Sequence, residues 1–304
     1  GKSFDVLLER KHVAQENLEI YNGILCPGFI NAHCHLELSH LYSMIEKKEG
    51  LINFIRDIKH RDSTDLADIM TAISNTESNM IDNGIVGVGD ICNTNHTITQ
   101  KRQQNIQYYN FIEIFETKES YVKDKIFEAR YLRSQFRDSN LTATIVPHAP
   151  YSVVPNLMKA IANEFDKEDR LLSIHIQETE LENMLFSTKK GELLEWLKSI
   201  KSSSSIWQDR EKSVDILLEL KMKEILMVHN TFAKKEDIRD YYYCTCPKAN
   251  QYIENYLPDY SIFNDSKLCV GTDSLASNNS LSVFEELLII KENSEFDIET
   301  LLKI

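Results

Sequence analysis

The sequence lacks the features that mark several large classes of protein. None of its 304 residues belongs to a window of about 18 or more consecutive apolar residues, which argues against a membrane-spanning helix. The first 23 residues mix charged with apolar side chains, so no secretory signal is expected. The net charge is −13 and no basic run exceeds a few residues. Because a nucleic-acid site needs a concentrated basic face, nucleic-acid binding is not expected either.

The cysteines include no CxxC pair. The six lie at positions 26, 34, 92, 244, 246 and 269, mostly in apolar runs such as SKLCVGT. This distribution predicts reduced, buried thiols in a cytoplasmic protein. Cys244 and Cys246 could ligate a metal, but alternation along a buried strand is the interpretation we favour.

Short apolar runs rich in β-branched residues recur along the chain, whose apolar fraction of 42% and charged fraction of 27% are ordinary for a soluble globular protein. We predict eight strands from these runs, at residues 23–33, 84–92, 106–115, 141–149, 171–178, 224–230, 241–247 and 267–273. Segments with helical periodicity lie between them, at 65–84, 156–165, 191–200 and 213–223. The serine-rich stretch at 201–207 is predicted to be a loop.

Strands that alternate with helices pair in parallel, and eight such units fit the size of a (β/α)8 barrel. We therefore predict the α/β class and a TIM barrel over residues 24–304, preceded by an N-terminal segment over 1–23. An open, doubly wound sheet is the alternative, but no GxGxxG motif follows the first predicted strand.

Polar residues cluster at the ends of the predicted strands. In a barrel of this kind the catalytic groups project from the carboxyl ends of the strands. Five of the nine histidines and one aspartate lie at such ends: His33, His35, His148, His175, His229 and Asp273. The sequence therefore predicts that these six side chains meet at one end of the barrel.

Each of these residues also has a structural explanation when taken alone. His175 and His229 could be neutral core histidines, His148 could bond the backbone of a loop, and Asp273 could cap a turn. The His33-Cys34-His35 pair could arise by chance, although side chains at i and i+2 of a strand point to the same side.

The combination favours a functional site. Buried strands rarely end in imidazole or carboxylate groups, because these cost free energy unless they are paired or bound to metal. Imidazoles with a carboxylate form a donor set for zinc or another divalent transition metal, and a structural zinc site would more typically contain several thiolates. Glu178, three residues after His175, could move a proton near a metal-bound water, or could be a solvated loop acid.

These residues resemble the amidohydrolase superfamily, and within it the aminohydrolase branch of heterocycle deaminases and chlorohydrolase-like proteins. The resemblance rests on the motifs PGFINAHCH, PHAPYS, HIQET, VHN and GTDSLASNNSLSVFEEL, and it spans roughly residues 24 to 290. It implies one divalent metal held by His33, His35, His175 and Asp273. It also implies that Glu178 shuttles a proton, that His229 positions the water or the developing charge, and that His148 contacts the substrate.

Two departures from the family pattern refine this interpretation. Binuclear members place a carbamylated lysine at the end of strand 4, whereas LTATIVPHAPYS contains no lysine, so a mononuclear site is expected. Relatives usually carry a small β-sandwich built from both ends of the chain. Here about 25 residues precede the strand that carries the HxH motif, so this domain is either reduced, with residues 1–23 as its remnant, or the sequence is incomplete.

The expected function is that of a metal-dependent hydrolase that deaminates an aminated heterocycle and releases ammonia. The resemblance favours a purine, a pyrimidine or an adenosine-type nucleoside as the small-molecule substrate, with no nucleic-acid or membrane partner. A cyclic-amide or halide hydrolase is the alternative within enzymes, and a metal-binding barrel without activity is the alternative outside them. Zinc is the expected ion and iron the alternative, since imidazole and carboxylate serve both. Whether the chain forms homo-oligomers is left open.

Overall fold

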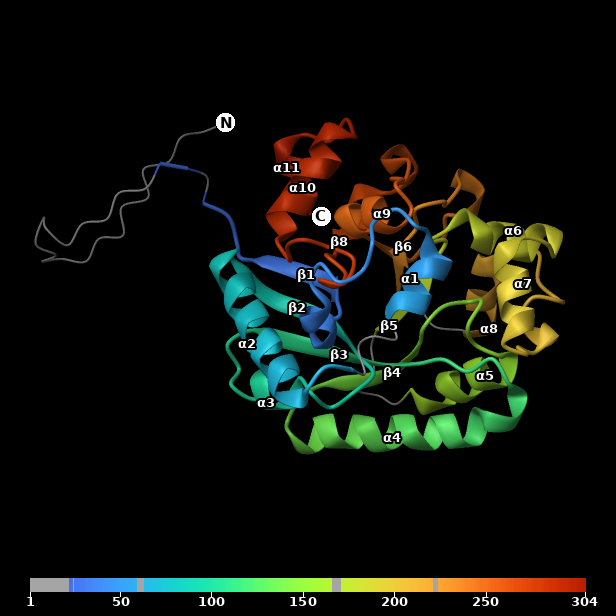
Figure 1. Ribbon diagram of the computed structural model, residues 1–304. Coiled ribbons are helices and arrows are strands. Elements are labelled where there is room, and N and C mark those ends of the chain that lie inside the picture. Colours follow the sequence, from blue (N-terminus) through green and yellow to red (C-terminus); the bar gives the residue numbers. More distant parts are fainter. Residues whose placement is uncertain (1–21, 24, 59–62, 166–170, 221–223) are drawn as a thin grey trace, which may run out of the picture.

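The fold is built on eight parallel strands. The computed structural model describes residues 22–23, 25–58, 63–165, 171–220 and 224–304 (Figure 1). The strands are β1 (Phe29–Cys34), β2 (Ile85–Cys92), β3 (Gln107–Ile114), β4 (Ala143–Pro147), β5 (Leu172–Ile176), β6 (Ile225–His229), β7 (Tyr242–Thr245) and β8 (Leu268–Val270). They form two four-stranded parallel sheets, β1 to β4 and β5 to β8, each in sequence order. All eight predicted strands are confirmed.

The first strand begins later than predicted. The prediction started it at residue 23, whereas β1 begins at Phe29, whose N–H donates to Gly84 O at 2.9 Å. Pro27 has no N–H to donate to a neighbouring strand, which favours a start after it. Gly28 also passes close to β2, because a Cβ at this position would lie 2.3 Å from Val86 Cγ1.

The two sheets meet at the carboxyl ends of their outer strands. Between β4 and β5, His175 N donates to His148 O at 2.8 Å. Between β8 and β1, Thr272 N and Asp273 N both donate to His33 O at 3.0 Å. Gly271 permits this second approach, since a Cβ there would lie 2.7 Å from His33 Cβ. The α/β arrangement of the (β/α)8 type is thus confirmed. In the described part of the chain, however, no ladder longer than a single bridge joins β4 to β5 or β8 to β1.

Helices surround the strands (Figure 1). They are α1 (Leu51–Asp57), α2 (Leu66–Asp82), α3 (Ile98–Lys101), α4 (Val122–Asp138), α5 (Pro155–Glu164), α6 (Glu180–Thr188), α7 (Glu192–Ser199), α8 (Leu217–Leu220), α9 (Pro247–Ile253), α10 (Val283–Glu292) and α11 (Ile298–Leu301). Helix α2 buries Ile69, Ile73 and Met80 at helical spacing. It is followed by Gly84 at a φ of +76°, a left-handed conformation that glycine adopts readily after a helix.

The helical predictions agree with the structure to within a few residues. Predicted segments 65–84, 156–165 and 191–200 correspond to α2, α5 and α7. Segment 213–223 begins with a 3-10 helix, Ser213–Ile216, and continues as α8, while its residues 221–223 lie outside the described residues. The predicted loop at 201–207 contains a short 3-10 turn, Ser204–Ile206.

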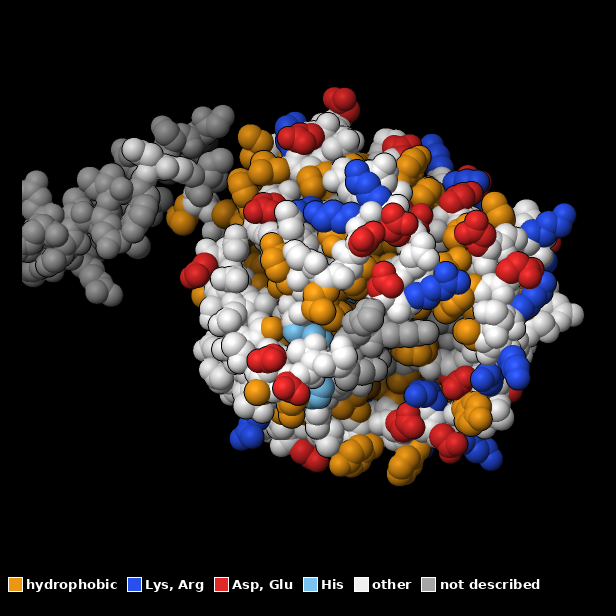
Figure 2. All heavy atoms as spheres, viewed as in Figure 1, with side chains coloured by type: hydrophobic (Ala, Val, Ile, Leu, Met, Phe, Trp, Pro, Cys, Tyr) orange, Lys and Arg blue, Asp and Glu red, His pale blue; other side chains and the backbone are white. Residues whose placement is uncertain are grey.

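Other sequence expectations concern the termini, the surface and the thiols. Most of the predicted N-terminal segment 1–23 lies outside the described residues. Among the described helices, none is long and apolar enough to cross a bilayer. Acidic and basic side chains are interspersed over the face in Figure 2. The cysteines are free thiols; Cys26 and Cys269 are half-buried, and Cys34, Cys92, Cys244 and Cys246 are buried.

Candidate metal and catalytic site

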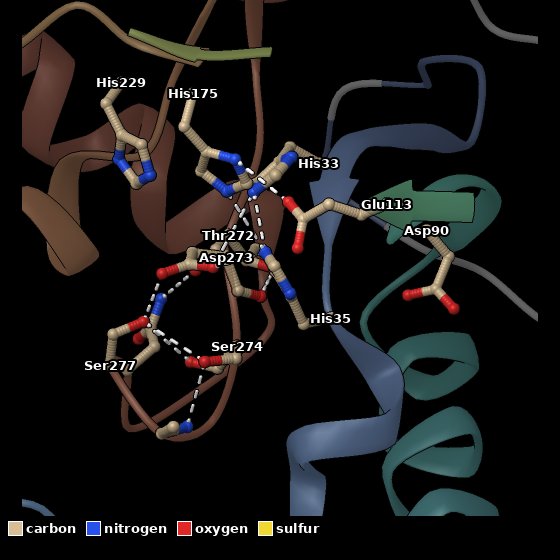
Figure 3. Close-up of polar contacts among 12 residues, drawn as sticks. His33, His35, Asp90, Glu113, His175, His229, Thr272, Asp273, Ser274 and Ser277 are labelled. Carbon is tan, nitrogen blue, oxygen red and sulfur yellow. Dashed lines mark hydrogen bonds and ion pairs between the residues drawn. The ribbon is translucent and has the colours of Figure 1, made fainter. Parts of the chain in front are cut away.

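Three histidine side chains converge at the carboxyl ends of β1 and β5. His33 is in β1, His35 follows it, and His175 is in β5 (Figure 3). The Nε2 atom of His35 lies 3.2 Å from Nε2 of His33 and 3.3 Å from Nε2 of His175. All three side chains are buried. The expectation that residues i and i+2 aim their rings at one point therefore holds for this pair.

Asp273 brings a carboxylate to the same point from the loop after β8. Its Oδ1 lies 3.4 Å from His35 Nε2 and 3.7 Å from His33 Nε2, while Oδ2 accepts a hydrogen bond from Ser277 Oγ. Burial alone would raise the pKa of Asp273, but the neighbouring His33, His35 and His229 side chains hold it well below its usual value. The φ of Asp273 is +56°, and such strain in a residue other than glycine is often found at functional sites.

The chemistry of these four groups fits a divalent metal ion. Burial lowers the pKa of His33 and His35, so both rings are neutral near pH 7 and each has one nitrogen with a free lone pair. Close nitrogen lone pairs and a carboxylate oxygen repel one another unless a proton or cation lies between them. His33, His35 and His175 are close enough together that one ion could bind all three. Nitrogen and oxygen donors of this kind suit zinc and similar ions.

Glu178 and His229 form a second pair beside the histidine cluster. Glu178 follows β5 after Gln177, whose φ of +50° turns the backbone, and its Oε1 lies 3.6 Å from His229 Nε2. Burial raises the pKa of Glu178 to about 8, so this carboxyl group holds a proton near neutral pH. A buried, protonated carboxyl group can act as an acid in catalysis.

His229 is the last residue of β6, and a hydrogen bond at its Nδ1 atom orients the ring. Its Nδ1 lies 2.8 Å from Oδ1 of Asn250 in α9, so Nδ1–H donates to the amide oxygen. Burial lowers the pKa of His229 to about 4, which leaves the ring neutral. In that tautomer Nε2 carries the lone pair and faces Glu178.

His148 follows β4 and lies beside His175. Its Nδ1 is 2.8 Å from Ser152 Oγ, and its ring centroid is 4.9 Å from that of His175. Its backbone oxygen accepts from His175 N and lies 3.1 Å from His175 Nδ1. His148 therefore contributes both to the shape of the site and to the orientation of His175.

The polar groups form the floor of one cavity of about 440 Å³. Every residue predicted for the site lines this cavity except His33, which lies behind the others. Most of the remaining lining is apolar, with Arg56, Glu116 and Lys125 also present, and its apolar side chains are Leu38, Leu51, Phe54, Ile55, Ile58, Phe115, Trp196 and Ile200. The cavity can thus hold a molecule with one polar, reactive end and one apolar end.

Two residues at the site were not found from the sequence. Glu113, near the end of β3, is buried with its Oε1 3.3 Å from His175 Nδ1. Its position near a strand end was a signal, but the sequence does not show whether an acid there faces the site or the solvent. Asn250 lies 21 positions after His229 on a helix, and no sequence signal that we know connects the two.

The chain belongs to the amidohydrolase family, which it matches over residues 24–303. The adenosine deaminase of Helicobacter pylori is 26% identical over 297 residues, covering 94% of this chain and 72% of that protein. The aminodeoxyfutalosine deaminase of a Nitratiruptor species is 25% identical, covering 90% of this chain and 70% of that protein. The crystal structure of H. pylori aminofutalosine deaminase in complex with methylthio-coformycin superposes with a TM-score of 0.79 at 22% identity. The match covers 91% of this chain and 70% of that one. The predicted resemblance to the aminohydrolase branch is confirmed.

Proposed function

We propose that this protein is a metal-dependent hydrolase that deaminates an aminated nucleoside and releases ammonia. The observation that carries the proposal is the clustering of three histidines and Asp273 beside the Glu178–His229 pair, with all of these residues except His33 lining one cavity. We assign one divalent ion, zinc, to His33, His35, His175 and Asp273. Bound there, the ion would supply a Lewis acid that lowers the pKa of water and makes hydroxide available near neutral pH.

Asp273 is suited to take the first proton. Its carboxylate is ionised over the working pH range and lies beside the three imidazoles, with one oxygen held by Ser277. An attacking water that forms a bond to the ring carbon must lose a proton, and Asp273 is the carboxylate at this end of the cavity that would accept it. The ring carbon then carries both a hydroxyl group and the original amino group.

Glu178 is suited to supply a proton to the ring. Because its carboxyl group is protonated near neutral pH, it can protonate the ring nitrogen next to the attacked carbon. Asp273 then passes its proton to the amino group, which departs as ammonia. As the carbonyl forms, the hydroxyl proton passes to the Glu178 carboxylate, so both acids return to their starting states. His229 can orient the attacking water, because the lone pair on its Nε2 accepts a hydrogen bond. The family resemblance implied that His229 positions either the water or the developing charge. This geometry favours the positioning of water.

The cavity supports a nucleoside more than a free base. A volume of about 440 Å³ is in the range of sites for complete small molecules, and the apolar wall lies away from the reactive floor. We place the aminated ring at the floor near His148, and a sugar with an apolar substituent against Phe54, Trp196 and Ile200. The names of the H. pylori and Nitratiruptor relatives, both of them deaminases, agree with this substrate class.

The test is an assay for ammonia released from a panel of aminated purines, pyrimidines and nucleosides by zinc-loaded protein. We expect release from nucleosides of one class and none when Glu178→Gln protein is used. A carbonyl product from a chlorinated or cyclic-amide compound without ammonia would favour the other hydrolases of the family. No turnover of any compound by zinc-loaded protein would overturn the proposal.

A further inference from the structure

Glu113 is a buried carboxylate on β3 that faces one of the proposed metal ligands. Its Oε1 lies 3.3 Å from His175 Nδ1 (Figure 3). Its Oε2 accepts a hydrogen bond from Asn93 Nδ2 at 3.1 Å. The residue is only 6% exposed. A carboxylate so far from water is costly unless it is paired, and His175 forms a charge pair with Oε1.

The two nitrogens of His175 face different partners. Nδ1 lies 3.1 Å from His148 O and 3.3 Å from Glu113 Oε1, and both of these are acceptors. Nδ1 therefore carries a proton. Nε2, 3.3 Å from His35 Nε2, is then the nitrogen that can bind a metal ion.

We propose that Glu113 is a positioning residue for the metal site, whose negative charge makes His175 a stronger ligand through Nδ1–H. A carboxylate that accepts a hydrogen bond from the outer nitrogen of a metal-bound imidazole fixes the ring and increases the basicity of the inner nitrogen. His148 O already orients the ring, so the distinct contribution of Glu113 is its charge. The inference rests on the metal site assigned under the proposed function.

A second metal ion held by Glu113 itself is the competing explanation. Glu113, His148 and His175 are close enough together to bind one. However, Nδ1 of His148 is engaged by Ser152 Oγ at 2.8 Å, and Nδ1 of His175 is engaged by His148 O. The nitrogen of His175 that faces Glu113 is thus already a donor to His148 O, which favours a charge interaction with Glu113 over a second metal ion.

The experiment measures zinc affinity by competition between metal-free protein and a chelating dye. Glu113→Gln keeps the size of the side chain and an acceptor oxygen but removes the charge, and we expect zinc to bind about 10- to 100-fold more weakly. The matched control is Glu77→Gln, a buried carboxylate on α2 that accepts from Asn105 and Tyr108 and contacts no proposed ligand. This control is expected to bind zinc as the wild type does. Replacing zinc by cobalt gives a spectroscopic readout, and the visible absorption should shift in Glu113→Gln but not in Glu77→Gln.

Several outcomes would overturn the inference. These are an unchanged zinc affinity in Glu113→Gln, an equal loss in both variants, or two ions per chain in the wild type with one in Glu113→Gln. If Glu113→Gln does not fold, Glu113→Asp and Glu113→Asn form a second pair that differs only in charge. The aspartate is then expected to bind zinc more tightly, and equal affinities would refute the role of the charge. Because no substrate is used, a failure of the deaminase proposal appears in the ammonia assay and not here.

Discussion

Glu178 and His229 face each other at the ends of adjacent strands, with Oε1 3.6 Å from Nε2. This relationship places a protonated carboxyl group and a neutral imidazole at the same end of the cavity. Glu178→Gln removes the acid and keeps its shape. We expect turnover to fall by at least about a hundredfold, as for the loss of general acid–base catalysis, with zinc content unchanged. Steady-state kinetics and elemental analysis of the same sample check this, and near-normal turnover would remove Glu178 from the mechanism.

His175→Ala should impair metal binding. The substitution removes one of the three Nε2 atoms of the cluster, in which that of His35 lies 3.2 Å from that of His33 and 3.3 Å from that of His175. We expect substoichiometric zinc after dialysis against metal-free buffer, measured by elemental analysis. His96→Ala, at a half-buried histidine outside the site, serves as the control and should retain zinc. Full occupancy in His175→Ala would refute the assignment of this ligand.

Asn250→Ala tests the orientation of His229. The 2.8 Å hydrogen bond from His229 Nδ1 to Asn250 Oδ1 holds the tautomer whose Nε2 can accept from water. Losing a hydrogen bond of this kind costs about 0.5–1.5 kcal/mol, so we expect a decrease of about 2- to 13-fold in kcat. Zinc affinity should not change, because Asn250 contacts none of the proposed ligands. An effect on zinc affinity with kcat unaltered would contradict this role.

Lys101→Met should destabilise the fold without touching the site directly. Lys101 Nζ is fully buried, where it forms an ion pair with Asp90 and donates to Asn110 Oδ1 at 2.6 Å. Burial lowers the pKa of Lys101, but the charge of Asp90 outweighs this and the net shift is upward. Removing the lysine leaves Asp90 uncompensated, at a cost of about 3–5 kcal/mol in the free energy of unfolding.

Denaturant unfolding measures this loss. Asp90→Asn combined with Lys101→Met should recover part of it, because neither charge is then left alone. Lys303→Met, in an exposed pair with Glu299, should leave the unfolding midpoint where it is. A Lys101→Met midpoint equal to that of the wild type would show that the buried pair does not contribute to stability.

Much of the fold could be predicted because β4, β5 and β6 are buried at every position, and the other strands at half or more of theirs. The run ILMVH of β6, for example, is buried at every position, and such runs stand out from the polar segments around them. The ends of the strands were predicted less accurately, as the start of β1 shows. Residues 23–28 share the apolar character of β1, but the parallel ladder starts only at Phe29, where a donor meets Gly84 O.

The site was predicted where chemistry and strand position coincide, and missed where only contact in space connects two residues. Histidines at strand ends are unusual enough to be noticed, as His33 and His175 were. Glu113 lies in FIEIF, where an acid could face either the solvent or the site, and one sequence does not decide between them. Asn250 meets His229 only because α9 packs against the end of β6.

The most direct test of the account is a zinc titration of metal-free protein, with ammonia release from the best nucleoside of the panel as the readout. We predict that metal-free protein is inactive, and that activity rises in proportion to zinc and levels off at one equivalent per chain. Full activity in the metal-free protein, or a plateau reached only at two equivalents, would contradict the single site built from His33, His35, His175 and Asp273.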